Sequence, residues 1–298
     1  MTKTLLQKEW FMIVLLVIAT LVWGSTFILT KWAVEDIDVS YFLFLRYLIS
    51  FITLALLFPK KLISLRLPTL KSGFFLSLFL TAIFLTQTEG LKITTASNSA
   101  LITGLYIVFI PLVSYFLFKT QSAIPSLLGI PISTIGLILL TQYSYTGMNK
   151  GDLLTLLCAI FSALHIVYTG KAAPHHSSRS LMIVQCLFVA LFCGALALSR
   201  GSFTSILSSR VILALLTTSL GCTVFAFTVQ IIAQRIIDPT RAGLIFALET
   251  VFGAFFASWW GGERMTSISF FGACLMVIGI LVSEMSPLVR KLVARREK

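Results

Sequence analysis

Ten long apolar runs fill almost the whole of this sequence, and only short segments separate each run from the next. A helix needs about 20 residues to cross the apolar core of a lipid bilayer. The ten runs are close to that length, and they cover residues 11–33, 40–58, 72–91, 95–118, 123–141, 152–171, 181–199, 211–233, 239–260 and 267–284. The connections leave no room for a soluble domain. The sequence therefore predicts an all-α polytopic membrane protein with ten transmembrane helices.

Composition and charge agree with this prediction. Of the 298 residues, 57% are hydrophobic and 11% are charged, whereas a soluble domain of this size needs more polar groups on its surface. If the N-terminus is cytoplasmic, 16 Lys and Arg fall on the cytoplasmic side and six on the outer side, with Arg46 inside a helix. This bias predicts cytoplasmic termini in a bacterial-type inner membrane. The net charge of +12 then indicates contact with anionic lipid rather than nucleic acid.

No metal or cofactor site is expected from the residue pattern. His165 lies in the middle of an apolar run and is expected to be a hydrogen-bonded packing residue, while His175 and His176 lie in a basic turn without a Cys or carboxylate partner. The five cysteines lack metal-ligand spacing, so we expect buried small hydrophobic side chains at Cys158, Cys186, Cys193, Cys222 and Cys274. The first apolar run has no small-residue cleavage site, which predicts an uncleaved first helix.

The chain repeats itself after about 143 residues. A shift of that length places Phe84 on Phe227, Gln87 on Gln230, Ser97 on Thr240, Val108-Phe109 on Val251-Phe252, and Gly129 and Gly136 on Gly272 and Gly279. We therefore expect two homologous repeats, residues 1–142 and 143–298. Five helices in each repeat is an odd number, so the two repeats have opposite orientations in the membrane. Inverted repeats are typical of secondary transporters, whose sites lie near the bilayer midplane between the repeats.

Polar and small residues within the first apolar runs are the first candidates for a site. Gly24 and Ser25 allow a neighbouring helix to approach closely, and Trp23 offers an amphipathic ring deeper than an interfacial belt would place it. Arg46 lies about two turns inside its run, where a guanidinium is costly unless it is paired or hydrated. Two alternatives stay open for Arg46, a functional role and an anchor whose side chain extends to the membrane surface.

A second group of candidates lies where runs three and four meet and in the matching part of the second repeat. Small and hydroxyl-bearing residues around Asn98 favour tight helix contact, and Pro111 is expected to break or bend its helix. The glycine pairs at 129/136 and 272/279 are expected to mediate helix packing or a dimer seam. The substrate-binding candidates of the whole chain are Trp23, Ser25, Arg46, Gln87, Asn98, Tyr106, Gln230, Arg241 and Glu249.

Glu249 is the costliest of these residues, because it lies near the centre of the ninth run. A carboxylate at that depth costs about 3 kcal/mol to insert, so it needs a partner or water. Two roles follow, proton exchange coupled to transport or binding of a cationic group on the substrate, with a hydrogen-bonded structural side chain as the alternative. Glu89 is a second coupling candidate.

These motifs resemble the drug/metabolite transporter superfamily, and in particular its ten-helix EamA-type branch. The resemblance covers nearly the whole chain, and its motifs are Trp23-Gly24-Ser25-Thr26-Phe27 with Lys31, Phe44-Leu45-Arg46-Tyr47, Gln87-Thr88 with Gly90-Leu91, Thr94-Thr95-Ala96-Ser97-Asn98, Gly104-Leu105-Tyr106, Pro239-Thr240-Arg241-Ala242, Leu248-Glu249 and Gly262-Glu263-Arg264. The resemblance implies two inverted five-helix bundles around a central cavity that moves small polar metabolites, often outward. Two positions depart from the family pattern: Thr250 stands where the family usually has proline, which puts a proline kink there in doubt, and Glu89 stands at a usually apolar position.

The leading function hypothesis is a secondary-active carrier of amino-acid-like metabolites that exports them by alternating access, as a monomer or homodimer. Uptake or exchange of a nucleoside-type metabolite such as S-adenosylmethionine is an alternative within the same class. A membrane-embedded enzyme acting on lipid-linked substrates is the alternative of another class, but it needs clustered carboxylates, histidines or metal ligands, and the sequence has no such cluster. A channel needs a pore-lining ring or filter, and a nucleotide-driven pump needs a complete phosphate-binding loop. The sequence has neither of these features. Because it also lacks the residue cluster that an enzyme needs, we expect no enzyme activity.

Overall fold

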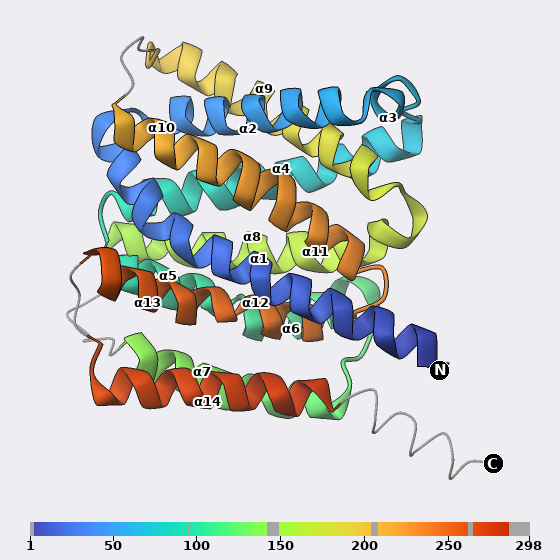
Figure 1. The fold of residues 1–298 in the computed structure, drawn as a ribbon, viewed down its shortest axis with the longest axis vertical. Coiled ribbons are helices and arrows are strands. Elements are labelled where there is room, and N and C mark those ends of the chain that lie inside the picture. Colours follow the sequence, from blue (N-terminus) through green and yellow to red (C-terminus); the bar gives the residue numbers. More distant parts are fainter. Residues whose placement is uncertain (1–2, 95, 142–148, 204–207, 262–264, 286–298) are drawn as a thin grey trace.

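The computed structural model describes residues 3–94, 96–141, 149–203, 208–261 and 265–285, which form a bundle of roughly parallel and antiparallel helices (Figure 1). The helices are α1 Lys3–Asp36, α2 Val39–Leu57, α3 Pro59–Ile63, α4 Leu67–Leu91, α5 Ala96–Gly104, α6 Tyr106–Phe118, α7 Ile124–Thr141, α8 Lys150–Ala172, η1 Ala173–His175, α9 Ser178–Arg200, α10 Ser209–Leu216, η2 Thr217–Ala226, α11 Phe227–Ala233, α12 Pro239–Phe246, α13 Leu248–Gly261 and α14 Ser267–Glu284. Within these described residues, nine helical stretches are long and apolar enough to cross a bilayer. The apolar helix Ile124–Leu140 is shorter, but it packs along α14, and we count it as the tenth crossing. The all-α polytopic fold is confirmed.

Polar residues at the ends of the runs determine where several helices begin. Asp38 accepts a hydrogen bond from the backbone N–H of Ser40 at the start of α2. Asn149 and Asp152 form a reciprocal capping box at the start of α8, and Ser177 caps α9. Such side chains satisfy backbone N–H groups that have no partner within the helix. Each apolar run is thereby separated from its neighbour by a short capped turn.

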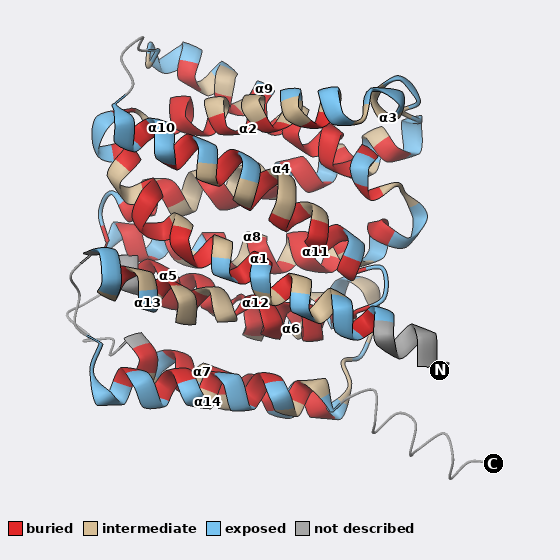
Figure 2. Cartoon of the chain, viewed as in Figure 1, coloured by how far each residue is buried: buried red, intermediate tan, exposed pale blue. Residues whose placement is uncertain are grey.

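Burial follows the pattern expected of a protein surrounded by lipid. Buried residues lie where the helices face one another, and the outer faces carry exposed residues (Figure 2). Many of the exposed side chains are large and apolar, among them Leu56, Phe116 and Phe270, and lipid rather than water is the solvent that suits them. Cys274 also lies on an exposed face of its helix. The expectation that all five cysteines are buried is therefore wrong for Cys274.

The contacts between α7 and α14 reveal the axis that relates the two repeats. The two helices run side by side (Figure 1), and their glycines meet crosswise. A Cβ atom on Gly129 would contact the carbonyl oxygen of Gly279, and one on Gly136 would lie 2.7 Å from that of Gly272. Ser133 donates a hydrogen bond to the carbonyl of Met276, its own equivalent 143 residues later, at 3.4 Å. Crosswise pairing of this kind is the signature of a two-fold axis, so the glycines act in helix packing within the chain.

Two crossings are interrupted at equivalent points of the two repeats. The fourth crossing breaks at Leu105, between α5 and α6, and the ninth breaks at Ala247, between α12 and α13. Pro111 lies inside α6, so the break expected at that proline falls six residues earlier. At the break in the ninth crossing, the hydroxyl of Thr250 donates to the carbonyl of Ala247 at 2.7 Å. Interrupted helices often mark the binding sites of transporters.

The eighth crossing has an irregular centre. Its ten middle residues, η2, form a π-helix between α10 and α11. The side chain of Thr223 donates to the carbonyl of Thr218 within this segment, at 2.9 Å. Stretches of π-helix occur frequently at functional sites, and this one packs against α1 and α2 in the middle of the bundle.

Candidate functional site

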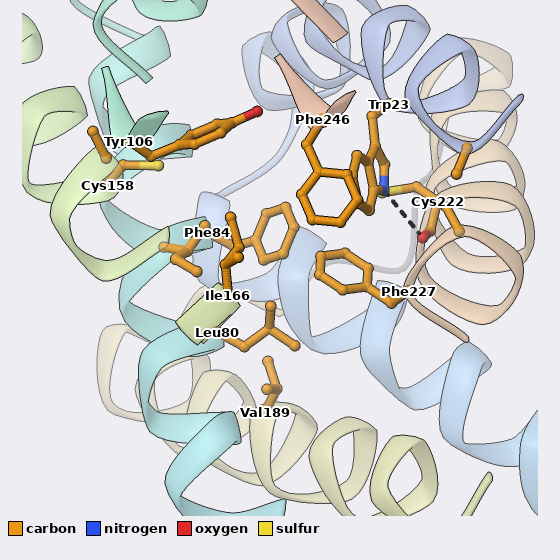
Figure 3. Packing of buried hydrophobic residues seen from close by; sticks show 14 of the residues in the cluster. Trp23, Leu80, Phe84, Tyr106, Cys158, Ile166, Val189, Cys222, Phe227 and Phe246 are labelled. Carbon is orange, nitrogen blue, oxygen red and sulfur yellow. Dashed lines mark hydrogen bonds between the residues drawn. The ribbon is translucent and has the colours of Figure 1, made fainter. Parts of the chain in front are cut away.

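A cavity of about 80 Å³ lies at the centre of the bundle, near the two helix breaks. This volume holds several water molecules or a small polar group. Its walls come from both repeats and consist of Trp23, Thr26, Phe27, Ile83, Phe84, Gln87, Thr103, Tyr106, Ser162, His165, Ile166, Cys222, Phe227, Gln230, Phe246 and Glu249. Aromatic rings form much of the wall, and those of Trp23, Phe84, Phe227 and Phe246 gather around one space (Figure 3).

The cavity lies on the axis that relates the repeats. Five pairs of its lining residues are separated by 143 positions, namely Trp23 with Ile166, Phe84 with Phe227, Gln87 with Gln230, Thr103 with Phe246, and Tyr106 with Glu249. The rings of Phe84 and Phe227 meet edge to face with their centroids 6.0 Å apart. Equivalent positions of the two repeats therefore line the same cavity, but they carry different side chains in three of the five pairs.

Glu249 and Tyr106 form the most polar of these pairs. Each stands directly after a helix break, Tyr106 as the first residue of α6 and Glu249 in the first turn of α13. The N-terminal end of a helix favours negative charge nearby. Among the lining residues Glu249 is the one acid, and none is Lys or Arg. The two side chains interact electrostatically, although no hydrogen bond of standard geometry to a described residue engages the Tyr106 hydroxyl.

Trp23 is fixed in the wall by contacts to the second repeat. Its Nε1 donates to the carbonyl oxygen of Cys222 at 3.4 Å, and its ring packs against Phe227 and Phe246 with centroids 5.2 and 5.3 Å away. The next residue, Gly24, allows α1 to lie close to α13, because a Cβ at this position would lie 2.6 Å from Cβ of Phe252. The expectation that Gly24 allows close helix contact is confirmed.

The two equivalent glutamines supply neutral hydrogen-bonding groups. Gln87 donates from Nε2 to Oγ1 of Thr103 at 3.4 Å, and Gln230 donates from Nε2 to Oε1 of Gln234 at 3.1 Å. An amide has two N–H donors and a carbonyl acceptor, so each glutamine keeps further capacity for a ligand. His165 also lines the cavity, and its Nε2 lies 3.0 Å from Oε1 of Gln185. His165 is thus hydrogen-bonded, as expected from the sequence, but it also forms part of the cavity wall.

Arg46 is buried behind the wall and does not extend to the membrane surface. It is 1% exposed. Its Nε donates to Oγ1 of Thr223 at 3.0 Å and its Nη2 to Sγ of Cys222 at 2.8 Å. The guanidinium carbon lies 4.1 Å from the centroid of the Phe84 ring. Phe84 and Cys222 both line the cavity, so one layer of side chains separates Arg46 from it.

Arg241 lies far from the cavity, in a buried ion-pair cluster that we call the terminal cluster. Its Nη1 lies 2.5 Å from Oε1 of Glu9, and its Nε lies 3.2 Å from Oε1 of Glu284. A further ion pair joins Nη2 of Arg241 to Glu284. These residues join the start of α1, the start of α12 and the end of α14, at the end of the bundle that we call the terminal face. The N-terminus marks this end in Figure 1.

The opposite end, which we call the far face, has a more exposed charge network. Glu89 lies there, and its Oε1 is 2.8 Å from Nη1 of Arg200. Burial acts to raise the pKa of Asp38, but hydrogen bonds from Ser40 and the charges of Arg200 and Lys92 outweigh it and lower the pKa. At the same face the buried carboxylate of Asp152 accepts a hydrogen bond from Oγ1 of Thr94 at 2.7 Å.

The structure brings together five of the nine predicted binding residues, and these line the cavity: Trp23, Gln87, Tyr106, Gln230 and Glu249. Ser25 is buried in α1 and donates to the carbonyl of Val22 at 2.8 Å, so it does not line the cavity. Asn98 belongs to α5, but its side chain lies outside the described residues. The coupling candidate Glu89 lies at the far face. Sequence reasoning missed Thr103, Ile166 and Phe246, although the 143-residue shift applied to the predicted residues leads to Ile166 from Trp23.

Known proteins resemble this chain over most of its length. An uncharacterized transporter of Archaeoglobus fulgidus is 29% identical over 272 residues, which cover 90% of this chain and 83% of the relative. An L-rhamnose-proton symporter of Yersinia pestis is 26% identical over 191 residues, which cover 57% of this chain and 54% of the symporter. A protein of known crystal structure, 18% identical, has the same fold with a TM-score of 0.74, over 93% of this chain and 97% of its own.

The family pattern matches each repeat separately. The sequence pattern of the EamA-like transporter family fits residues 10–142 and again residues 149–285. The two matches together cover nearly all of the ten crossings, and the interrupted helices and the central cavity lie within them. The chain is therefore a multi-pass membrane transporter that belongs to the EamA-like transporter family.

Proposed function

We propose that the protein is a secondary-active carrier that exports small, polar, amino-acid-like compounds in exchange for protons. The observation that carries the proposal is the position of Glu249, the one acid among the lining residues of a cavity between inverted repeats. Inverted-repeat carriers bind substrate between the repeats and expose the site to each side in turn. A carboxylate at that position has contact with whichever solution the cavity faces.

The lining residues support an ammonium-bearing substrate. The ionised Glu249 carboxylate is the natural partner for an ammonium group, and the rings of Trp23, Phe84 and Phe227 attract cations through their faces. The amides of Gln87 and Gln230 add neutral hydrogen bonds for other polar groups of the substrate. Apolar and aromatic walls with a few polar groups are typical of small-molecule sites.

Exchange follows from the use of one carboxylate for two ligands. A proton and an ammonium group compete for Glu249, so the carrier moves one of them in each direction. With cytoplasmic termini, as the positive-inside bias predicts, an inward proton gradient drives the substrate outward. The similarity to L-rhamnose-proton symporters favours a second candidate, proton-coupled movement of a sugar, for which the aromatic walls and glutamines are also suited.

The proposal is tested with Glu249→Gln in proteoliposomes. The wild-type protein is expected to accumulate labelled amines or amino acids against an imposed pH gradient, and Glu249→Gln is expected to abolish this accumulation, because an amide neither titrates nor binds an ammonium group by charge. Glu89→Gln is the matched control, since it makes the same change at the far face, away from the cavity. Labelled sugars in the same assay identify the second candidate.

Accumulation by Glu249→Gln at the wild-type rate, with an unchanged pH profile, would show that the residue is structural. Equal losses in Glu249→Gln and Glu89→Gln would also contradict the proposal, because the effect would then not depend on the cavity.

A further inference from the structure

A buried arginine that pairs with no acid in the described part of the chain lies next to the cavity, and the proposed function does not use it. Arg46 is 1% exposed in the second crossing. No carboxylate of the described residues forms an ion pair with it, in contrast to Arg200 and Arg241. A charged side chain inside a membrane is costly and is a functional candidate by default.

The hydrogen bonds of Arg46 use only one edge of its guanidinium group. Nε and Nη2 lie along that edge, and they donate to Thr223 and Cys222 of the π-helical segment. Both acceptors are neutral. A guanidinium has five N–H donors in a planar fork, and no described residue accepts a hydrogen bond from Nη1. The edge formed by Nη1 and Nη2 therefore keeps the geometry that binds a carboxylate through two hydrogen bonds.

Only the wall of the cavity separates the guanidinium group of Arg46 from the site of Glu249. The Phe84 ring lies 4.1 Å from the guanidinium carbon and lines the cavity. Cys222 accepts a hydrogen bond from Arg46 and lines the same cavity as Glu249. The Phe84 ring is therefore the side chain that lies between a ligand in the cavity and the cation.

We infer that Arg46 forms a carboxylate subsite next to the cavity, and that the substrate carries both an ammonium and a carboxylate group. The inference rests on the proposed function, because Glu249 is assigned the ammonium end. Phe84 rotates to let the carboxylate reach Arg46, and the remaining part of the substrate lies against Trp23 and Phe227. The equivalent position of the second repeat is Val189, which is apolar and buried. The cation is therefore present on one side of the axis, and the substrate binds in one orientation.

The test compares matched ligands that differ in the carboxylate alone. Thermal stabilisation of the purified protein is measured with the standard amino acids, their methyl esters and their decarboxylated amines. For the wild-type protein, we expect at least one amino acid to bind about tenfold or more tightly than its ester and amine. In Arg46→Gln this ratio is expected to fall to within about twofold, while the affinity for the amine stays unchanged.

Two further variants separate recognition from packing. Arg46→Lys keeps the charge but loses the planar fork, so it is expected to restore part of the preference for the amino acid. Thr223→Val removes one acceptor of Arg46 within the π-helical segment and is expected to keep the ratio. The ratio is read within each variant, so a general loss of stability does not change it.

Three results would overturn the inference. These are binding of amines or esters as tightly as of amino acids by the wild-type protein, an equal loss of all ligands in Arg46→Gln, and stabilisation by no amino acid. The proposed function is judged separately, because pH-driven accumulation of an amine or a sugar that depends on Glu249 would stand even if every carboxylate-bearing ligand failed.

Discussion

The terminal cluster predicts that Glu9→Gln opens the terminal face of the carrier. Alternating access requires the helix ends at one face to separate while those at the other face close. At the terminal face, Arg241 joins Glu9 of α1 to Glu284 of α14. The side chains of Arg241 and Glu9 are only 6% and 8% exposed, so solvent screens this pair little. These ion pairs favour the state that is closed at this face.

The size of the effect follows from the ion pair that changes. Removal of one partner of a buried ion pair costs about 3–5 kcal/mol when the other charge is left unpaired. Glu9→Gln leaves Arg241 paired with Glu284 and able to donate to the new amide oxygen, so the closed state is expected to lose less, about 1–1.5 kcal/mol. Since 1.4 kcal/mol corresponds to a factor of ten, the population open at the terminal face is expected to rise about tenfold.

Native cysteines report this change. Cys222 lines the cavity, whereas Cys186 is buried elsewhere. With a small charged thiol reagent applied at the terminal face of sealed vesicles, Glu9→Gln is expected to raise the modification rate of Cys222 about tenfold and to leave Cys186 unmodified, as read by mass spectrometry. An unchanged rate at Cys222 would refute the assignment of the cluster as a closure.

The matched control acts at the other face. Glu89→Gln breaks the ion pair with Arg200, whose side chain is 42% exposed. Exposed pairs contribute at most about 1 kcal/mol, so this variant is expected to change the populations less and in the opposite direction. A tenfold rise at the terminal face in Glu89→Gln as well would show that general loosening, rather than the cluster, governs access to Cys222.

Two other predictions concern packing and orientation. Gly24→Ala places a Cβ 2.6 Å from Phe252 Cβ and 2.9 Å from the carbonyl oxygen of Glu249, whereas a Cβ in the control Gly253→Ala meets nothing nearer than Phe27 at 3.5 Å. Overpacking costs about 1–3 kcal/mol, so Gly24→Ala is expected to lower both the thermal unfolding temperature and the transport rate, while Gly253→Ala changes neither. Equal effects of the two variants would contradict the close contact at Gly24. The charge bias predicts that alkaline phosphatase fused after Asp38 is active and that fused after Leu65 is inactive in cells, and activity at Leu65 would overturn the proposed orientation.

The sequence was sufficient for the crossings and for the repeat, because both are recorded in local patterns. Apolar run length identifies helices that must satisfy their own backbone groups in lipid, and the 143-residue shift identifies the repeated unit. The same shift also leads from Tyr106 to Glu249, two residues that were chosen for separate reasons and that lie together in the cavity. Tyr106 and Glu249 lie together because a two-fold axis relates the two repeats. The sequence does not show the position of that axis, whereas the packing of α7 against α14 does.

Other features depend on contacts that no local pattern records. The sequence groups Arg241 with Glu249 because both lie in the part of the second repeat that matches runs three and four, but the ion-pair partner of Arg241, Glu9, is 232 residues away in the chain. The direction of the Arg46 side chain depends on the π-helical segment, and nothing in the residues of η2 distinguishes it from an ordinary helix. Phe84 and Phe227 are two of 25 phenylalanines in the chain, and burial alone does not separate wall residues from packing residues.

The relation between a symmetric backbone and asymmetric side chains explains how the two faces differ. Glu9 and Asp152 are equivalent acids, 143 residues apart, each near the start of the first helix of its repeat. Each is buried and contacts the opposite repeat, but Glu9 binds the charged Arg241 and Asp152 binds the neutral hydroxyl of Thr94. We expect equivalent backbones to give the two access states of the proposed transport cycle similar packing, so that such pairs set the difference in free energy between the states. The Glu9–Arg241 contact joins two opposite charges, whereas Thr94 is neutral. We therefore expect the state closed at the terminal face to be favoured, and we expect substitutions at Thr94 and Arg241 to change that preference.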